Sequence, residues 1–120
     1  MYIKKIIYFS KVDREAELCI SDGVYSVISY AYPVNAVVVN QEVDAIYGFE
    51  CTNVVRATEQ NYRINKLPAY FAYEVTAEVI SICDNIVKVG DLRIYLDAVI
   101  PNDVSNGEYV SFSVLRFDFG

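Results

Sequence analysis

The chain has 120 residues, of which 54% are hydrophobic and 22% charged, so it can bury a core of its own and is not a disordered chain. Its formal net charge is −6, from 16 acidic and 10 basic residues, and it contains no histidine. Histidine is the commonest general acid–base group, the commonest activator of Ser and Cys nucleophiles and the commonest metal ligand. We therefore expect a protein that is not an enzyme and that needs no metal or cofactor.

The N-terminal segment 1–11 is basic and mostly apolar. Lys4 and Lys5 are followed by only four apolar residues, Ile6 to Phe9, which is too short for the core of a signal peptide. No apolar run in the chain approaches the roughly 20 residues that a membrane-spanning helix needs. These features predict a cytoplasmic protein without a membrane-spanning segment.

Strand signals begin in the first half of the chain. Asp22-Gly23 separates two strand-like runs and is typical of a tight hairpin turn. From Glu42 the residues alternate between polar and apolar, and the alternation continues through Tyr47 and Phe49. This pattern predicts a strand from Glu42 with Tyr47 and Phe49 on its buried face. The polar stretch 53–65 is either a long loop or a turn of helix.

The second half repeats the period of two more clearly. Residues 71–79 alternate strictly, as do residues 92–98, and Gly90-Asp91 has the glycine-first order of a hairpin turn. In the last segment the apolar phase changes, because Val110, Phe112 and Val114 share one face and then Leu115, Phe117 and Phe119 take over. Such a change indicates a β-bulge or a strand that passes between two sheets.

Together these signals predict an all-β fold with little or no helix. Several short strands separated by glycine-containing turns favour a small antiparallel barrel or sandwich, and the part from Val75 to Phe119 has the look of an OB-like barrel. We expect residues 1–120 to form a single β domain, in which 1–66 and 67–120 could be two halves. Fold class alone does not fix function.

The three cysteines, Cys19, Cys51 and Cys83, favour neither a disulfide framework nor a zinc site. Their number is odd, no two of them form a CxxC pair, and Cys19 lies between the apolar residues Leu18 and Ile20. We expect reduced, buried thiols that act as small hydrophobic side chains.

Pairs of carboxylates are the best candidates for catalytic chemistry, and they are weak ones. Glu15 and Glu17 share a strand face, and so do Glu42 and Asp44. Acid–base catalysis needs two carboxylates in different environments, whereas residues two apart on an exposed face are solvated alike. Residues 102–108 have the residue types of a calcium loop in the wrong order, and the phosphate-binding glycine motifs are absent.

The distribution of charge points to binding. Between Glu15 and Val55 there is no Lys or Arg, and this stretch includes six acidic residues. It is either an ordinary solvated surface or a surface for a positively charged partner, because complementary charge speeds encounter and sharpens specificity. Nucleic acid is not expected as a partner, since phosphate contacts need Lys and Arg. The alternatives are an OB-like nucleic-acid or oligosaccharide binding module, or a non-catalytic subunit of a larger assembly.

A resemblance narrows the kind of partner. Several segments resemble small bacterial proteins; they are 77–80, 85–92, 96–97, 100–101, 107–110 and 116–118. Some of these bacterial proteins are similar to immunity proteins of contact-dependent growth inhibition and other polymorphic toxin systems. These are barrel-forming positions of the C-terminal part. The resemblance implies a cytoplasmic protein that binds one cognate toxin and has no activity of its own.

A nuclease is the toxin that an acidic protein suits best, because nuclease active sites are basic. We therefore interpret the chain as an immunity protein that covers such an active site. The candidate partner-binding residues are acidic and aromatic: Glu15, Glu17, Asp22, Tyr30, Tyr32, Glu42 and Asp44.

Overall fold

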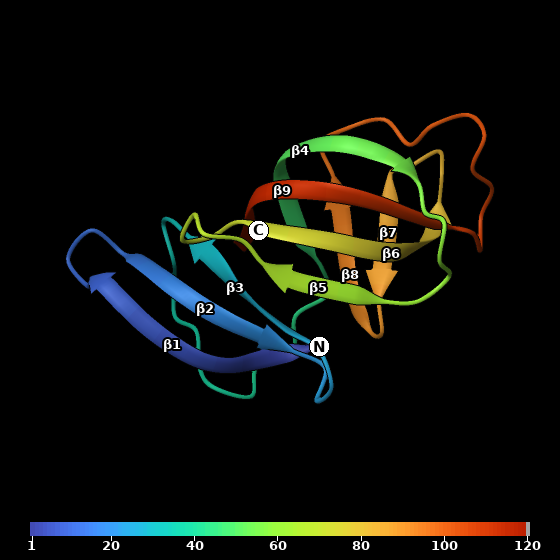
Figure 1. Ribbon diagram of the computed structural model, residues 1–120. Coiled ribbons are helices and arrows are strands. Elements are labelled where there is room, and N and C mark those ends of the chain that lie inside the picture. The colour runs from blue at the N-terminus through green and yellow to red at the C-terminus, as the bar shows by residue number, and fades with distance from the viewer. Residues whose placement is uncertain (120) are drawn as a thin grey trace.

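The computed structural model describes residues 1–119, which form nine β-strands and no helix (Figure 1). The all-β prediction is therefore confirmed. The strands are β1 (Tyr2–Ser10), β2 (Glu15–Ser21), β3 (Ser26–Ala31), β4 (Ile46–Arg56), β5 (Arg63–Lys66), β6 (Tyr73–Ser81), β7 (Ile86–Val89), β8 (Leu92–Leu96) and β9 (Tyr109–Phe119).

Five of the strands close into a barrel. Around the ring, β4 pairs with β9, β9 with β6, β6 with β7 and β7 with β8, all antiparallel, and a parallel pairing of β8 with β4 closes it. The hairpin-connected strands β6, β7 and β8, with β9 returning beside β6, have the order of a Greek key. Of the two predicted architectures, barrel and sandwich, the structure is a small Greek-key barrel. OB-like barrels belong to the same class.

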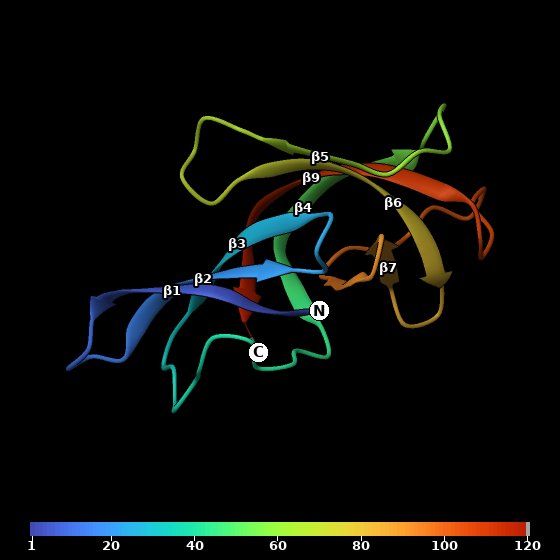
Figure 2. The same ribbon diagram turned by 90° about the horizontal axis from the view of Figure 1, so that it is seen from below.

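The remaining strands extend the sheet beyond the barrel. β1, β2 and β3 form an antiparallel extension, which joins the barrel where β3 pairs in parallel with the end of β9, Ser29 opposite Phe117 and Tyr30 opposite Asp118. Figures 1 and 2 show this extension to one side of the barrel. β5 is added at the other end of the strand order, beside β6.

The change of apolar phase in the last strand marks this junction. Along its first half β9 pairs with β6 and buries Val110, Phe112 and Val114; along its last half it pairs with β3 and buries Phe117. Between the two, Leu115 is 44% exposed. The expected change of phase is present, but all nine strands belong to one continuous sheet, so β9 does not pass between two sheets, and Leu115 is not on the buried face.

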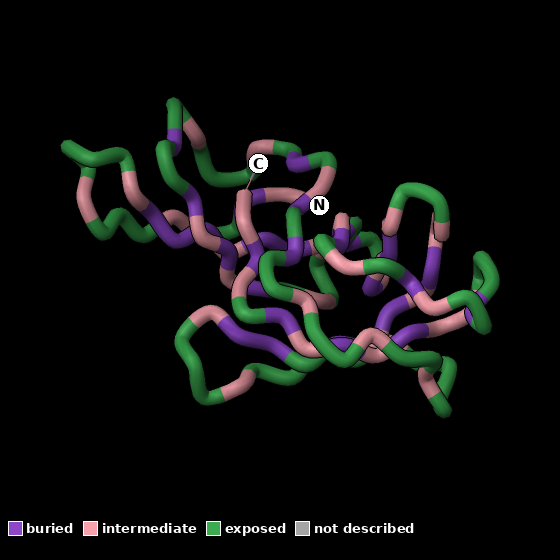
Figure 3. Tube along the Cα trace, turned by 90° about the horizontal axis from the view of Figure 1, so that it is seen from above, coloured by how far each residue is buried: buried purple, intermediate pink, exposed green. Residues whose placement is uncertain are grey.

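One hydrophobic core runs through both parts of the molecule. It includes Ile20 and Val27 from the extension and Ile94, Phe112 and Phe117 from the barrel, all of them nearly or fully buried. In Figure 3 buried segments accordingly occur in the barrel and in the extension. The extension is therefore packed on the barrel and shares its core.

The prediction of a strand from Glu42 is wrong in its start and in its phase. Residues 40–43 instead bond the edge of β1: the N–H of Asn40 donates to the carbonyl of Ile3 (2.7 Å), and the N–H of Val43 to that of Met1 (2.9 Å). β4 begins at Ile46, which is buried, so Tyr47 and Phe49 point outward and are 46% and 38% exposed.

The cysteines are free, as expected, but they are not all buried. Cys83 is exposed in the turn between β6 and β7, whereas Cys19 and Cys51 are partly buried. Burial is the main cause that raises the pKa of the Cys51 thiol to about 12; a backbone hydrogen bond with Asp97 acts to lower this pKa, and the side-chain hydrogen bond and charge of Asp97 act to raise it. The Cys51 thiol is therefore protonated at neutral pH, which makes it a poor nucleophile.

Candidate binding surface

A row of four polar and aromatic side chains crosses the outside of the sheet. Tyr30 on β3 is paired with Asp118 on β9, Asp118 with Tyr47 on β4, and Tyr47 with Tyr95 on β8. Directly paired residues place their side chains on the same face. We call these four residues the tyrosine row; none of them belongs to the buried core.

The arginine beside this row is already engaged. The Arg116 guanidinium lies 4.8 Å from the ring centre of Tyr30 and 4.6 Å from that of Phe49. Its Nε donates a hydrogen bond of 2.6 Å to Asp118 Oδ1. Arg116 therefore stacks between two rings, and its positive charge is matched by a carboxylate.

Three of the predicted residues, Glu15, Glu17 and Tyr30, meet at the extension end of the row. The Tyr30 hydroxyl donates to the Glu15 carboxylate, and the Tyr70 hydroxyl donates to that of Glu17. These carboxylate acceptors raise the pKa of both phenols, because the phenol donates only while it is protonated. The two carboxylates thus lie on one face, as the sequence predicted.

Their solvation was wrongly predicted to be alike. Glu17 is only 7% exposed, while Glu15 is partly exposed. The difference comes from the loop between β5 and β6, which lies beside the extension (Figure 2) and whose Tyr70 hydroxyl is bonded to Glu17. The Phe71 ring contacts Phe9 and Tyr30 edge-on, with ring centres 6.3 and 5.8 Å away. Glu17 is therefore covered by the protein's own loop and is not free to contact a partner.

Asp22 is also occupied within the protein. Its Oδ1 accepts hydrogen bonds from the N–H groups of Val24 (2.8 Å) and Tyr25 (2.7 Å), and its Oδ2 accepts one from Asp91 (2.8 Å). Partial burial acts to raise the pKa of Asp22, but these backbone donors outweigh it, so the pKa lies below its ordinary value. The geometry makes Asp22 a structural residue that holds two turns together.

Glu42 and Asp44 lie at the other end of the tyrosine row. With Tyr47 and Tyr95 they line a hollow of about 390 Å³, which we call the acidic hollow; its other lining residues are Val43, Ala45 and Phe119. Both carboxylates are exposed, and within residues 1–119 neither forms an ion pair. The remaining predicted residue, Tyr32, is 61% exposed just beyond the end of β3.

The predicted residues therefore do not form one patch: Glu15, Glu17 and Tyr30 meet at one end of the tyrosine row, Glu42 and Asp44 lie at the other, and Asp22 and Tyr32 lie elsewhere. What connects two of these places is a set of residues that the sequence did not single out: Tyr47, Phe49, Tyr95, Arg116 and Asp118. Tyr47 and Phe49 were available to sequence analysis but were assigned to the core. Their outward position follows from the phase of β4, which the sequence does not indicate.

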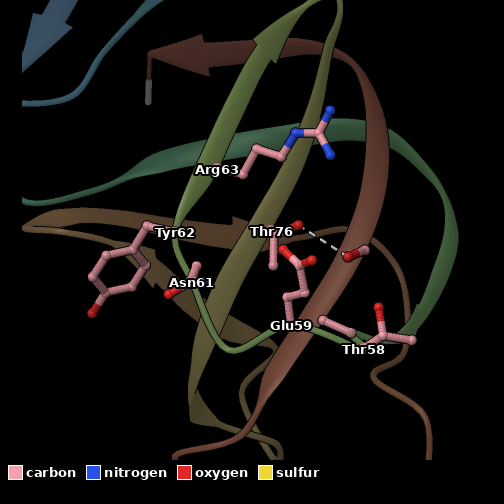
Figure 4. Close-up of a pocket in the computed structure, with 8 residues that line it drawn as sticks. Thr58, Glu59, Asn61, Tyr62, Arg63 and Thr76 are labelled. Atoms are coloured by element: carbon pink, nitrogen blue, oxygen red, sulfur yellow. Dashed lines mark hydrogen bonds between the residues drawn. The ribbon is translucent and has the colours of Figure 1, made fainter.

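A second hollow has a volume of about 290 Å³ (Figure 4). It is lined by residues of the β4–β5 loop and of β5, β6 and β9, including Glu59, Arg63 and Thr76. The Thr76 and Ser111 hydroxyls are hydrogen-bonded to each other (3.0 Å), and the Tyr62 hydroxyl donates to Glu78 (2.9 Å). None of the predicted residues lies here, and the hydroxyl groups of Tyr62, Thr76 and Ser111 already have hydrogen-bond partners within the protein.

The described part of the chain holds no cluster of three or more Cys, Asp or Glu residues suited to a metal ion, and no helix that could cross a membrane. No protein-family model, curated protein or solved structure matches the chain. We therefore infer function from the geometry and charge of the surface alone.

Proposed function

We propose that this chain is a cytoplasmic immunity protein: a non-catalytic bacterial protein that binds and neutralises one cognate toxin domain of a contact-dependent growth inhibition or polymorphic toxin system. The observation that supports this best is the tyrosine row with its flanking carboxylates. Glu15 lies at one end of the row, Glu42 and Asp44 lie at the other, and Arg116 between them is matched by Asp118.

Such a face suits a partner with a basic surface. The active site of a nuclease is positively charged because its substrate is a polyanion, and an acidic protein can occupy it by attraction of opposite charge. The net charge of −6 adds long-range attraction, which speeds the encounter. Tyrosines supply large, rigid contact areas with few rotatable bonds, which lowers the entropy lost on binding. A nuclease domain is therefore the toxin class that we propose.

A nucleic-acid binding module is the competing function, because a Greek-key barrel with outward tyrosines could stack bases. The carboxylates along the same row oppose it. Glu42 and Asp44 would be brought close to phosphate groups, and Arg116, which lies beside the same row, is already paired with Asp118. Phosphate contacts supply most of the affinity in such complexes, so this face would bind a single strand poorly.

The test asks whether a gene next to this one in the source genome encodes a large secreted protein, which would be the candidate toxin. Its C-terminal domain is produced in a test bacterium with and without this chain, and binding of the two purified proteins is measured by calorimetry. We expect growth to be restored and the complex to form at nanomolar or tighter affinity, on the scale of specific inhibitor complexes. Failure to restore growth, combined with micromolar binding of single-stranded oligonucleotides at low salt, would overturn the proposal.

A further inference from the structure

We propose that the acidic hollow receives an arginine side chain of the partner protein. The inference deepens the proposed function, since it rests on a basic partner and specifies the side chain through which that partner is anchored. It starts from a cavity, two stacked rings and two unpaired carboxylates that the fold brings together from the 40–45 loop, β4 and β8.

The walls of the hollow provide the two kinds of group that a guanidinium group binds, aromatic rings and carboxylates. The Tyr47 and Tyr95 rings are stacked, with centres 5.3 Å apart and planes 18° apart, and they provide aromatic surface. Glu42 and Asp44 provide carboxylate oxygens. A guanidinium group can stack on an aromatic ring with its flat face while its N–H groups donate to a carboxylate.

The same face already contains this arrangement in a filled form. Arg116 lies between the Tyr30 and Phe49 rings and donates to Asp118. Asp118 is paired in the sheet with Tyr47, so the filled arrangement and the empty one are neighbours along the tyrosine row. The acidic hollow repeats the rings and the carboxylates of the filled arrangement but holds no arginine of this chain.

The other occupants that the hollow could take fit it less well. A phosphate would be repelled by two carboxylates. A metal ion would need more ligands than these two side chains supply, and no such cluster is found within residues 1–119. A lysine ammonium group has the right charge, but it is compact and strongly hydrated and does not present a flat face to a ring. Arginine is therefore the side chain to which the geometry points.

The test titrates the native protein with three small probes: N-acetyl-arginine amide, N-acetyl-lysine amide and the neutral N-acetyl-citrulline amide. Ring signals of Tyr47 and Tyr95 are followed by NMR. We expect saturable shifts with the arginine probe, affinity about fivefold weaker or more with the lysine probe, and no saturation with the citrulline probe. Equal binding of arginine and lysine, equal shifts with citrulline, or arginine shifts confined to other residues would overturn the inference.

Two double variants distinguish binding in the acidic hollow from a general effect of net charge. Glu42→Gln with Asp44→Asn should weaken arginine binding about tenfold or more, because both carboxylate acceptors are lost. Glu74→Gln with Asp103→Asn removes the same number of exposed carboxylates elsewhere and should leave the binding unchanged. If both double variants weaken the binding equally, the effect is that of net charge and the inference fails.

The growth assay tests the proposed immunity function independently of the arginine site. If the chain protects cells but the native protein does not bind the arginine probe, the hollow inference fails and the immunity function stands. If the arginine probe binds at Tyr47 and Tyr95 but cells are not protected, the immunity function fails and the arginine site stands.

Discussion

The Asp22 carboxylate accepts a hydrogen bond from the backbone N–H of Asp91, with Oδ2 and N 2.8 Å apart. This contact joins the turn between β2 and β3 to the turn between β7 and β8, and so fastens the extension to the barrel. The other oxygen of the same carboxylate closes the β2–β3 turn itself through Val24 and Tyr25. A residue predicted to face a partner thus belongs to the framework that positions the binding face.

Replacing Asp22 should therefore reduce stability. We expect Asp22→Ala to lower the free energy of unfolding by about 1–3 kcal/mol, since three backbone N–H groups lose a charged acceptor. Urea unfolding followed by circular dichroism measures the change. Asp103→Ala, at an exposed side chain in the loop before β9, is the control and should stay within about 0.5 kcal/mol of the native protein. Equal stability of the two variants would contradict this role of Asp22.

The contribution of Asp22 should also depend on pH. Its pKa is lowered in the folded protein, so the stabilisation is complete above the unfolded-state pKa of about 3.9 and is lost as the pH falls through the folded-state pKa. The stability difference between the native protein and Asp22→Asn should accordingly be larger at pH 7 than at pH 3. Urea titrations at both pH values measure it, and a difference that grows in acid would show that the sign is wrong.

Gly90 tests the same junction from the barrel side. Its φ angle is +58°, and a Cβ atom added there would lie 2.5 Å from Asp22 Oδ2 and 2.8 Å from Tyr25 Cδ2. Gly23 has a φ angle of +97° but open space around it. Gly23→Ala should cost about 1–2 kcal/mol from backbone strain alone, and Gly90→Ala should cost more, because it adds a steric clash. Thermal unfolding of the two variants should rank them in this order; the reverse order would mean that the turns are not in contact.

The phase change in β9 can be checked with two neighbouring apolar residues. Phe117 is fully buried where β9 meets β3, and Leu115 is 44% exposed. Phe117→Ala should cost about 3–5 kcal/mol through lost burial and a cavity, whereas Leu115→Ala should cost less than about 1 kcal/mol. Chemical unfolding measures both. A large loss of stability in Leu115→Ala with a small loss in Phe117→Ala would show that Leu115, and not Phe117, is in the core.

Local patterns predicted the parts of this fold in which one strand face is buried and the other is solvated. The alternation through residues 71–79 therefore located β6, and the change of phase after Val114 located the junction in β9. The same rule failed at Tyr47 and Phe49, where aromatic residues occupy the outer face of β4 and the sequence offers no sign of which face is outside.

The candidate site was harder to predict because it depends on pairings between distant segments. Tyr47 meets Tyr95 through the parallel pairing of β4 with β8, and Tyr30 meets Asp118 through that of β3 with β9. The covering of Glu17 depends on Tyr70, which lies in a loop whose path no local pattern indicates. Charge composition indicated the character of the surface, and the pairing of strands decided which residues form it.

The most direct test of the central claim compares the rate at which two charge-reversed variants associate with the cognate toxin domain. Glu15→Lys with Asp44→Lys changes both ends of the tyrosine row, and Glu74→Lys with Asp103→Lys changes exposed sites away from it. Both variants have a net charge of −2, since each reversal adds two charges to −6. We predict an association rate about tenfold lower and less sensitive to salt for the first variant only. Equal rates for the two variants would contradict the account.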